Sequence, residues 1–176
     1  MSSKSGDGGN KMTVGGRLCV YALLTALCMV IGFLESLIPT DAAVPGVKLG
    51  LANSVALLLV CKGDAKGAFA VNTARIILSS LLFGSALSLL FSFTAGMCSL
   101  AAVALIKRTN VFDIVGLSVS GAVVHNLIQL AVAMLVVGSA AAVWLPVLLL
   151  SGIISGAVTG TLCTVILKKI ETNRKK

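Results

Sequence analysis

Charged side chains are scarce in this sequence: they make up 11% of the 176 residues, whereas 57% of the residues are hydrophobic. A typical soluble domain has about a quarter charged residues, which cover its surface in water. The composition therefore excludes an ordinary soluble fold and predicts an integral membrane protein. The net charge of +8 would suggest nucleic acid in a soluble chain, but here the basic residues flank apolar segments, so we expect no nucleic-acid partner.

Clusters of metal-binding or catalytic side chains are also absent. The sequence has one histidine, and its six acidic residues lie at least six positions apart. A metal site needs three or four ligands close together, and prenyl-chain elongation on a diphosphate needs clustered aspartates to hold magnesium. No glycine-rich loop leads into Lys-Ser or Lys-Thr, as a phosphate-hydrolysing motor requires. We therefore expect no metal, no cofactor and no enzymatic activity of the chain alone.

Six apolar stretches divide the chain. A helix needs roughly 20 residues to cross the hydrocarbon core of a bilayer, and two of the six stretches are shorter than that. We predict an all-α fold, with one six-helix transmembrane domain over residues 17–168 between basic cytoplasmic tails at 1–16 and 169–176. The helices are expected at about 18–38, 49–61, 67–84, 86–106, 111–137 and 142–167.

The positions of the basic residues predict the orientation of this domain. Twelve of the fourteen lie in the tails and in alternate loops, while Lys48 lies on the opposite side and Arg75 lies within a helix. Lysine and arginine accumulate on the cytoplasmic side of membrane proteins. Both termini are therefore predicted to be cytoplasmic, in a multi-pass protein of a bacterial plasma membrane. An alternative with four crossings, in which residues 49–84 form a re-entrant pair, would put Lys62 and Lys66 on the wrong side.

Polar side chains gather in the outward-facing half of the predicted bundle. His125 lies roughly 21 Å along its outward-running helix, and Gln129 follows one turn later on the same face. Polar groups are destabilising in lipid, so they mark candidate binding sites. Because the inner half is almost purely apolar, we expect an outward-facing pocket with a closed floor. The predicted ligand-binding residues are Glu35, Lys48, Asn53, Asn72, Arg75, His125, Asn126 and Gln129. Alternatively, Glu35 and Lys48 are interfacial charges, and the His125 group forms hydrogen bonds between helices.

Two stripes of small residues predict close helix contacts. Gly152, Gly156 and Gly160 follow one another at one-turn spacing, as do Ala22 and Ala26. Such stripes let helix backbones approach closely in a membrane. For the glycines we expect packing inside the bundle. The two alanines are less diagnostic by themselves, because alanine is abundant in membrane helices.

Three motifs carry a family resemblance: Gly46-x-Lys48-Leu49-Gly50-Leu51-Ala52-Asn53, Asn72-x-x-Arg75 and His125-Asn126-x-x-Gln129. The sequence resembles the Gx transporter family, whose members are often labelled heptaprenyl diphosphate synthase component I, over about residues 12–170. That family is similar to the S components of energy-coupling factor transporters. The resemblance implies six helices, cytoplasmic termini and an extracellular-side vitamin pocket. It also implies that Ala22 and Ala26 dock a transmembrane coupling subunit.

Two functions follow from these observations. The first is a substrate-binding membrane subunit for uptake of a small molecule, such as a vitamin, a flavin or a quinone or isoprenoid precursor. By the resemblance, separate ATPases would supply the energy through the coupling subunit. The alternative is a membrane subunit associated with prenyl diphosphate or quinone biosynthesis, non-catalytic alone. The missing aspartate clusters conflict with a synthase activity in this chain.

Overall fold

The computed structural model describes residues 13–37 and 50–174, and every regular element in these ranges is helical. The prediction of an all-α fold is confirmed for this part of the chain. Two short 3-10 helices, η1 (Leu51–Asn53) and η2 (Ser139–Trp144), precede the second and sixth α-helices. The α-helices are α1 (Val14–Ser36), α2 (Ser54–Cys61), α3 (Ala65–Phe83), α4 (Ala86–Arg108), α5 (Ile114–Val137) and α6 (Leu145–Arg174).

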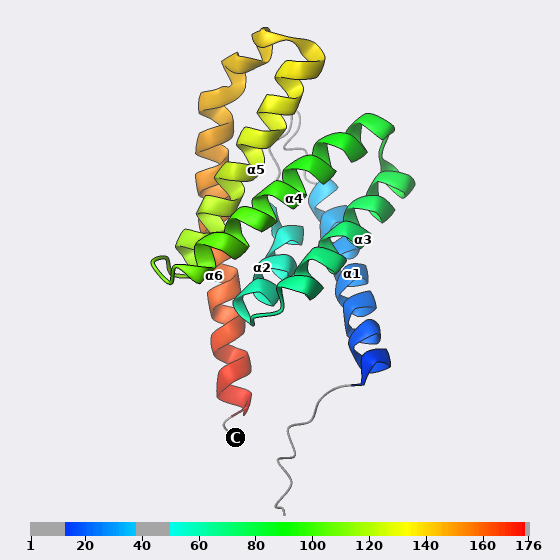
Figure 1. Ribbon diagram of the computed structural model, residues 1–176, viewed down its shortest axis with the longest axis vertical. Helices are drawn as coiled ribbons and strands as arrows, with labels where there is room; N and C mark the ends of the chain where they lie inside the picture. Colours follow the sequence, from blue (N-terminus) through cyan, green and yellow to red (C-terminus); the bar gives the residue numbers. More distant parts are fainter. Residues whose placement is uncertain (1–12, 38–49, 175–176) are drawn as a thin grey trace, which may run out of the picture.

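The helices run back and forth between two ends of the bundle (Figure 1). At one end, here called the Ser36 end, α1 finishes and α3 turns into α4. The opposite end, here called the Lys107 end, holds the turn between α2 and α3 and the turn between α4 and α5. Basic side chains gather at the Lys107 end: Lys62, Lys66, Lys107 and Arg108.

Four helical stretches are long and apolar enough to cross a membrane: Val14–Glu35, Ala86–Arg108, Ile114–Val137 and Ser139–Asn173. The chain is therefore a multi-pass membrane protein. The two remaining helices differ from these four, since α2 has only eight residues and α3 carries Lys66, Asn72 and Arg75. The short α2 is enclosed by other helices, with six of its eight residues buried, whereas the second half of α3 carries exposed apolar side chains such as Leu81 and Phe83.

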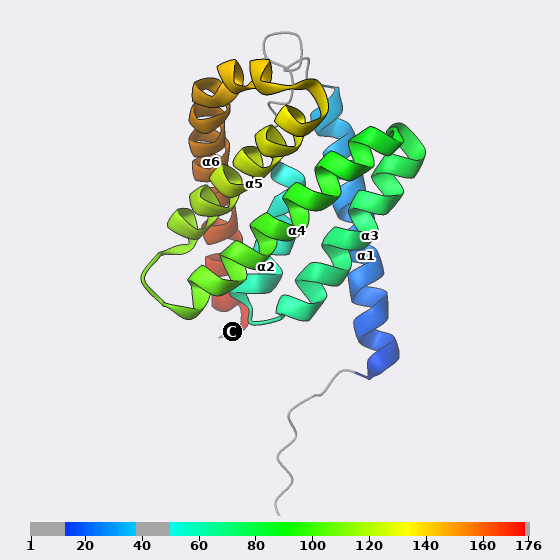
Figure 2. The ribbon, with the colours of Figure 1, turned by 45° about the horizontal axis from the view of Figure 1, so that its top comes forward.

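The short helix α2 lies in the middle of the bundle (Figure 2). It contacts α3, α4 and α6, and six of its eight residues are buried. Eight residues at 1.5 Å per residue make a helix about 12 Å long. That length fills the centre of the bundle near the Lys107 end and leaves space above η1, toward the Ser36 end.

A lysine from α4 holds the end of α2. The last carbonyl groups of a helix have no partner within the helix. The Nζ atom of Lys107 donates hydrogen bonds to the carbonyl oxygens of Val60 and Cys61, the latter at 2.6 Å. Its positive charge also matches the negative end of the α2 dipole. The contact therefore determines where α2 stops relative to α4.

An aspartate joins α1 to the turn between α2 and α3. The Oδ1 atom of Asp64 accepts a hydrogen bond from the Gly67 amide at 2.9 Å and caps α3, while the Tyr21 hydroxyl donates to Oδ2 at 2.6 Å. The hydrogen bond from Tyr21, followed by that from Gly67, holds the pKa of Asp64 below its usual value. Both bonds favour the ionised carboxylate. Asp64 thus positions α1 beside α3 at the Lys107 end.

The glycine stripe of α6 packs against α5. A Cβ atom at Gly156 would lie 2.6 Å from Cα of Val119, and one at Gly160 would lie 2.7 Å from Cα of Val115. A Cβ at Gly152 would lie 2.9 Å from Nδ2 of Asn126. The α5 and α6 backbones are therefore too close to admit a side chain between them.

The helix boundaries differ from the expected ones by up to seven residues, and three of the differences are described here. The first helix begins at Val14 rather than at 18, because Thr13 caps it by accepting a hydrogen bond from the Gly16 amide at 3.3 Å. The segment at 49–61 starts as 3-10 helix after Gly50, whose φ of 71° is left-handed. The sixth helix continues to Arg174 rather than ending at 167. Apolar runs mark where lipid would lie, whereas caps and helix propensity determine where helices end.

Replacing Lys107 by methionine is expected to destabilise the bundle, because it leaves the carbonyl oxygens of Val60 and Cys61 without their charged donor. Hydrogen bonds to charged groups contribute about 1.5 to 3 kcal/mol, and partial exposure places this one toward the lower value. Thermal unfolding in detergent measures the loss. Arg108→Met, at an exposed neighbouring site, is the control; equal melting temperatures for the two variants would contradict the anchoring role.

Candidate functional site

A wide cavity of about 290 Å³ opens near the Ser36 end of the bundle. Its walls come from α1, η1, α3, α4 and α5, with one residue from α6. Its position follows from the shortness of α2, which leaves the centre of the bundle unfilled on this side. Small-molecule sites in proteins typically occupy about 300 to 1,000 Å³, so the wide cavity has the size of a small-molecule site.

The structure brings most of the predicted ligand-binding residues together. Six of them line the wide cavity: Glu35, Asn53, Arg75, His125, Asn126 and Gln129. Asn72 does not line it but lies buried below Arg75. Lys48 lies outside the described residues. These six residues come from four different helical elements and line the same cavity. Whether they bind a ligand stays a prediction.

The guanidinium of Arg75 is held by two asparagines. Its Nη2 atom donates to Oδ1 of Asn53 at 3.1 Å and to Oδ1 of Asn72 at 3.3 Å. Its Nε atom is enclosed and has no hydrogen-bond partner. No carboxylate of the described residues lies within 4.0 Å of it. Arg75 is thus a fixed positive charge at the cavity wall, and neutral amides, not a counter-ion, hold it.

Asn72 supports this arrangement from below. Its side chain is 3% exposed, and its Nδ2 atom donates to the carbonyl oxygen of Gly96 on α4 at 3.3 Å. That bond turns the amide oxygen toward Arg75. A Cβ at Gly96 would lie 2.7 Å from Cδ1 of Ile76 and 3.2 Å from Nδ2 of Asn72, so the close approach of α3 and α4 depends on this glycine.

Glu35 contributes a carboxylate to the same cavity. Its Oε1 atom accepts a hydrogen bond from the backbone amide of Gly50, which joins the end of α1 to the start of η1. Among the described residues it has no ion-pair partner. The wide cavity therefore has one positive and one negative side chain in its walls, and the two do not form an ion pair with each other.

The three polar residues of α5 that line the wide cavity differ in their hydrogen bonds. Nδ1 of His125 lies 3.4 Å from the Ser99 hydroxyl. Asn126 donates from Nδ2 to the carbonyl oxygen of Leu148 at 2.7 Å, and it lies 3.4 Å from the Ser151 hydroxyl. Gln129 makes no hydrogen bond to any residue that the structure describes. Asn126 therefore has a structural role between α5 and α6, while the amide of Gln129 is available to a ligand.

Two kinds of lining residue are not among the predicted ligand-binding residues. Phe33 and Phe83 face each other with ring centroids 5.7 Å apart, and both line the wide cavity. Serines from α3 and α4 complete the wall: Ser79, Ser80, Ser88 and Ser92. Aromatic and serine residues are frequent in membrane helices for other reasons, so their sequence positions gave no specific signal.

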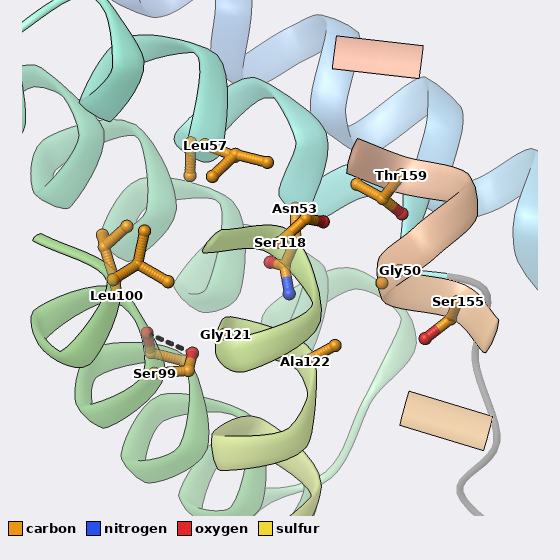
Figure 3. Close-up of a pocket in the computed structure, with 14 residues that line it drawn as sticks. Gly50, Asn53, Leu57, Ser99, Leu100, Ser118, Gly121, Ala122, Ser155 and Thr159 are labelled. Carbon is orange, nitrogen blue, oxygen red and sulfur yellow. Dashed lines mark hydrogen bonds between the residues drawn. The ribbon is translucent and has the colours of Figure 1, made fainter. Parts of the chain in front are cut away.

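A narrow chamber of about 70 Å³ adjoins the wide cavity on the side of the Lys107 end. Figure 3 shows the residues that line it. Four residues border both spaces: Gly50, Asn53, Ala122 and Ser155. The chamber is lined partly by hydroxyl groups, including those of Ser99 and Ser118. The expected floor of the pocket therefore contains a small space, because small hydroxyl-bearing residues and glycines separate α2, α4, α5 and α6 there.

The two predicted docking alanines lie away from the cavity. Ala22 and Ala26 are exposed on α1 and line neither space. Exposed apolar side chains accompany them, including Leu23 and Leu27. This face of α1 is open to lipid or to another helix. Within the described ranges, no group of three His, Cys, Asp or Glu side chains is placed to hold a metal ion.

The fold and the site together define a helical multi-pass membrane protein with a small-molecule-sized cavity in its bundle. Residues 24–166 match the model of the family described as heptaprenyl diphosphate synthase component I. The chain belongs to this family, as its sequence motifs predicted. No curated protein and no solved structure matches the chain.

Replacing Asn126 and Gln129 singly by leucine is expected to separate structural from binding roles. Asn126→Leu removes a bond between α5 and α6, and such bonds contribute about 0.6 kcal/mol on average and up to about 1.7 kcal/mol in membranes. Gln129→Leu removes no bond to a described residue and is expected to leave the melting temperature unchanged. Thermal unfolding of both variants in the same detergent makes the comparison; a larger loss for Gln129→Leu would overturn these assignments.

Proposed function

We propose that this protein is the substrate-binding membrane subunit of an uptake system for a small molecule. The observation that carries the proposal is the guanidinium of Arg75, which lies in the wall of a 290 Å³ cavity and has neutral amides as its partners. Burying a charge without a counter-ion is destabilising. An anionic or carbonyl-bearing ligand group at Arg75 would supply the missing interaction, including a partner for Nε.

The remaining cavity residues suit a polar ligand of modest size. Gln129 provides an amide that has no partner in the described residues, and the serines of α3 and α4 provide hydroxyl groups. Phe33 and Phe83 provide a flat apolar surface. A vitamin, a flavin or a quinone precursor is a ligand that these residues could bind. Glu35 adds a negative charge, so a ligand with several negative charges is disfavoured.

The distribution of charge supports an outward-facing cavity. Lysine and arginine accumulate on the cytoplasmic side of membrane proteins, and here they gather at the Lys107 end, opposite the cavity. In the proposed orientation the chain passes through the plasma membrane six times, with the short α2 enclosed in the bundle. Both termini are cytoplasmic, and the wide cavity opens to the outside. The ligand is captured there without chemistry in this chain.

Energy for uptake would come from a partner. The exposed face of α1 around Ala22 and Ala26 offers small side chains against which a helix of a coupling subunit can pack closely. In this proposal, separate ATPases act through that subunit. The docking face and the wide cavity are separate surfaces, so coupling and ligand binding can be disrupted independently.

A second candidate is a membrane subunit that assists a soluble prenyl diphosphate synthase, and the family description favours it. The cavity does not suit a diphosphate, because its described walls contain one guanidinium and one carboxylate. Purification of the protein distinguishes the two functions. Retention of a small molecule by the chain alone supports capture, whereas obligatory co-purification with a soluble synthase supports the alternative.

Replacing Arg75 by glutamine is expected to weaken ligand retention by about ten- to a hundredfold, since a charged hydrogen bond contributes about 1.5 to 3 kcal/mol. The purified protein is incubated with a defined mixture of water-soluble vitamins, flavins, quinone precursors and isopentenyl diphosphate. Gel filtration then removes unbound compounds, and mass spectrometry identifies those retained.

Arg108→Gln, which removes the same charge at the opposite end, is the control for Arg75→Gln. It is expected to retain compounds as the wild type does. Unchanged retention by Arg75→Gln, together with a lowered melting temperature, would show that Arg75 holds the helices together and binds nothing.

Replacing Ala22 and Ala26 together by tryptophan is expected to abolish uptake by cells while ligand retention by the purified chain survives. The bulky rings would fill the one-turn notch on α1 and keep a partner helix away. Substituting Leu23 and Leu27, which are also exposed on α1, by tryptophan tests whether the effect is specific to the notch. Normal uptake by the alanine double variant would contradict docking at this face.

A further inference from the structure

The narrow chamber beneath the wide cavity has walls of a different chemistry. Four α-helices and η1 surround it, and none of the described residues that line it is ionisable. Part of its lining is apolar, including Leu57, Leu100 and Val103, and hydroxyl-bearing residues from α4, α5 and α6 form another part. A charged group would be strongly destabilised in such a space, whereas an uncharged hydrogen-bonding group would not.

One hydroxyl group in the chamber lacks a partner in the described residues. Ser118 on α5 is 7% exposed, and its Oγ atom forms no hydrogen bond to a described residue. That atom is not among the fully enclosed unsatisfied atoms, and Ser118 lines the chamber. The Ser99 hydroxyl, by contrast, donates to the carbonyl oxygen of Gly96 at 3.2 Å. Ser118 is therefore the hydroxyl that a bound group can engage.

Asn53 joins the chamber to the wide cavity, because it lines both. Its Oδ1 atom accepts the hydrogen bond from Arg75, and its Nδ2 atom donates to no described residue. The NH₂ group of an amide lies on the opposite side from its oxygen. A molecule bound at Arg75 would thus have a second, unfilled donor beside it at the mouth of the chamber.

We propose that the narrow chamber is a second subsite, which takes a slender, uncharged, hydrogen-bonding arm of the same molecule whose anionic or carbonyl group lies at Arg75. This inference rests on the proposed function. The chamber volume of about 70 Å³, against about 290 Å³ for the wide cavity, requires the arm to be narrow. Ser118 and the Nδ2 atom of Asn53 require it to carry oxygen or nitrogen acceptors, so a long hydrocarbon chain does not fit.

The other possible occupant is water. Buried polar chambers often hold ordered water molecules with two to four polar partners, and Ser118 and Asn53 could bind them. Filling the chamber with a larger side chain distinguishes the two occupants by its effect on ligand binding. Displacing water alone leaves ligand binding intact, whereas blocking an arm of the ligand weakens it.

Ser118→Val tests the subsite, because valine occupies the void and removes the hydroxyl. The defined mixture of vitamins, flavins, quinone precursors and isopentenyl diphosphate is the probe, and retained compounds are measured after gel filtration. Retention is expected to fall at least tenfold. Ser118→Ala, which removes only the hydroxyl and leaves the space, is expected to lower retention several-fold and guards against misfolding of the valine variant.

Ser120→Val is the matched control on the same helix, since Ser120 lines neither space and bonds to its own helix at the Gly116 carbonyl. It is expected to retain compounds as the wild type does. Wild-type retention by folded Ser118→Val and Ser118→Ala would show that the chamber holds water, and it would overturn the second subsite while leaving the proposed function standing. If the wild type retains no compound at all, the proposed function fails, and the subsite fails with it.

Discussion

The burial of α2 is the constraint on which the other features depend. An eight-residue helix cannot cross a bilayer by itself, and its unsatisfied terminal groups cannot face lipid. In the bundle, α2 is enclosed among α3, α4 and α6, and Lys107 donates hydrogen bonds to its last carbonyl groups. At the other end, Glu35 accepts from Gly50 just before η1. The centre of the bundle is thereby filled near one end only.

The cavity is the consequence of this half-filled centre. Side chains from α1, α3, α4 and α5 surround a space that no helix occupies, and polar groups can face it without meeting lipid. Arg75 is the clearest case: two asparagines hold its guanidinium, but they do not neutralise it. A partly buried charge that has only neutral hydrogen-bond partners in the described part of the chain is destabilising for the empty protein. The same feature gives an incoming anionic or carbonyl group a strong, directional partner.

Much of the fold could be predicted from the sequence, since apolar length and the placement of lysines respond directly to the bilayer. The central position of α2 could not, because a short apolar run is compatible with a crossing helix, a re-entrant segment or a core helix. The residues around the wide cavity were also predicted as a group, because Arg75, His125 and Gln129 are rare types within a membrane helix. Their convergence is a geometric result, and their role in binding remains a proposal.

The narrow chamber could not be predicted from the sequence. A serine or threonine in a helix commonly bonds to the carbonyl one turn earlier, as Thr94 does to Leu90 and Ser120 does to Gly116. Ser118 has the same sequence character, and only the helix packing shows that it lines a void and bonds to no described residue. The difference in hydrogen bonding between Asn126 and Gln129 also comes from the helix packing. Both amides lie on α5, but only Asn126 meets a carbonyl of α6.

Native mass spectrometry of the purified wild-type protein, released gently from detergent, shows whether this chain by itself captures a small molecule. We expect a one-to-one complex with a compound small enough for the wide cavity, which carries an acidic or carbonyl group and leaves the protein on collisional activation. A protein that is always empty, or that carries a soluble synthase subunit in place of a small molecule, would rule out capture by this chain.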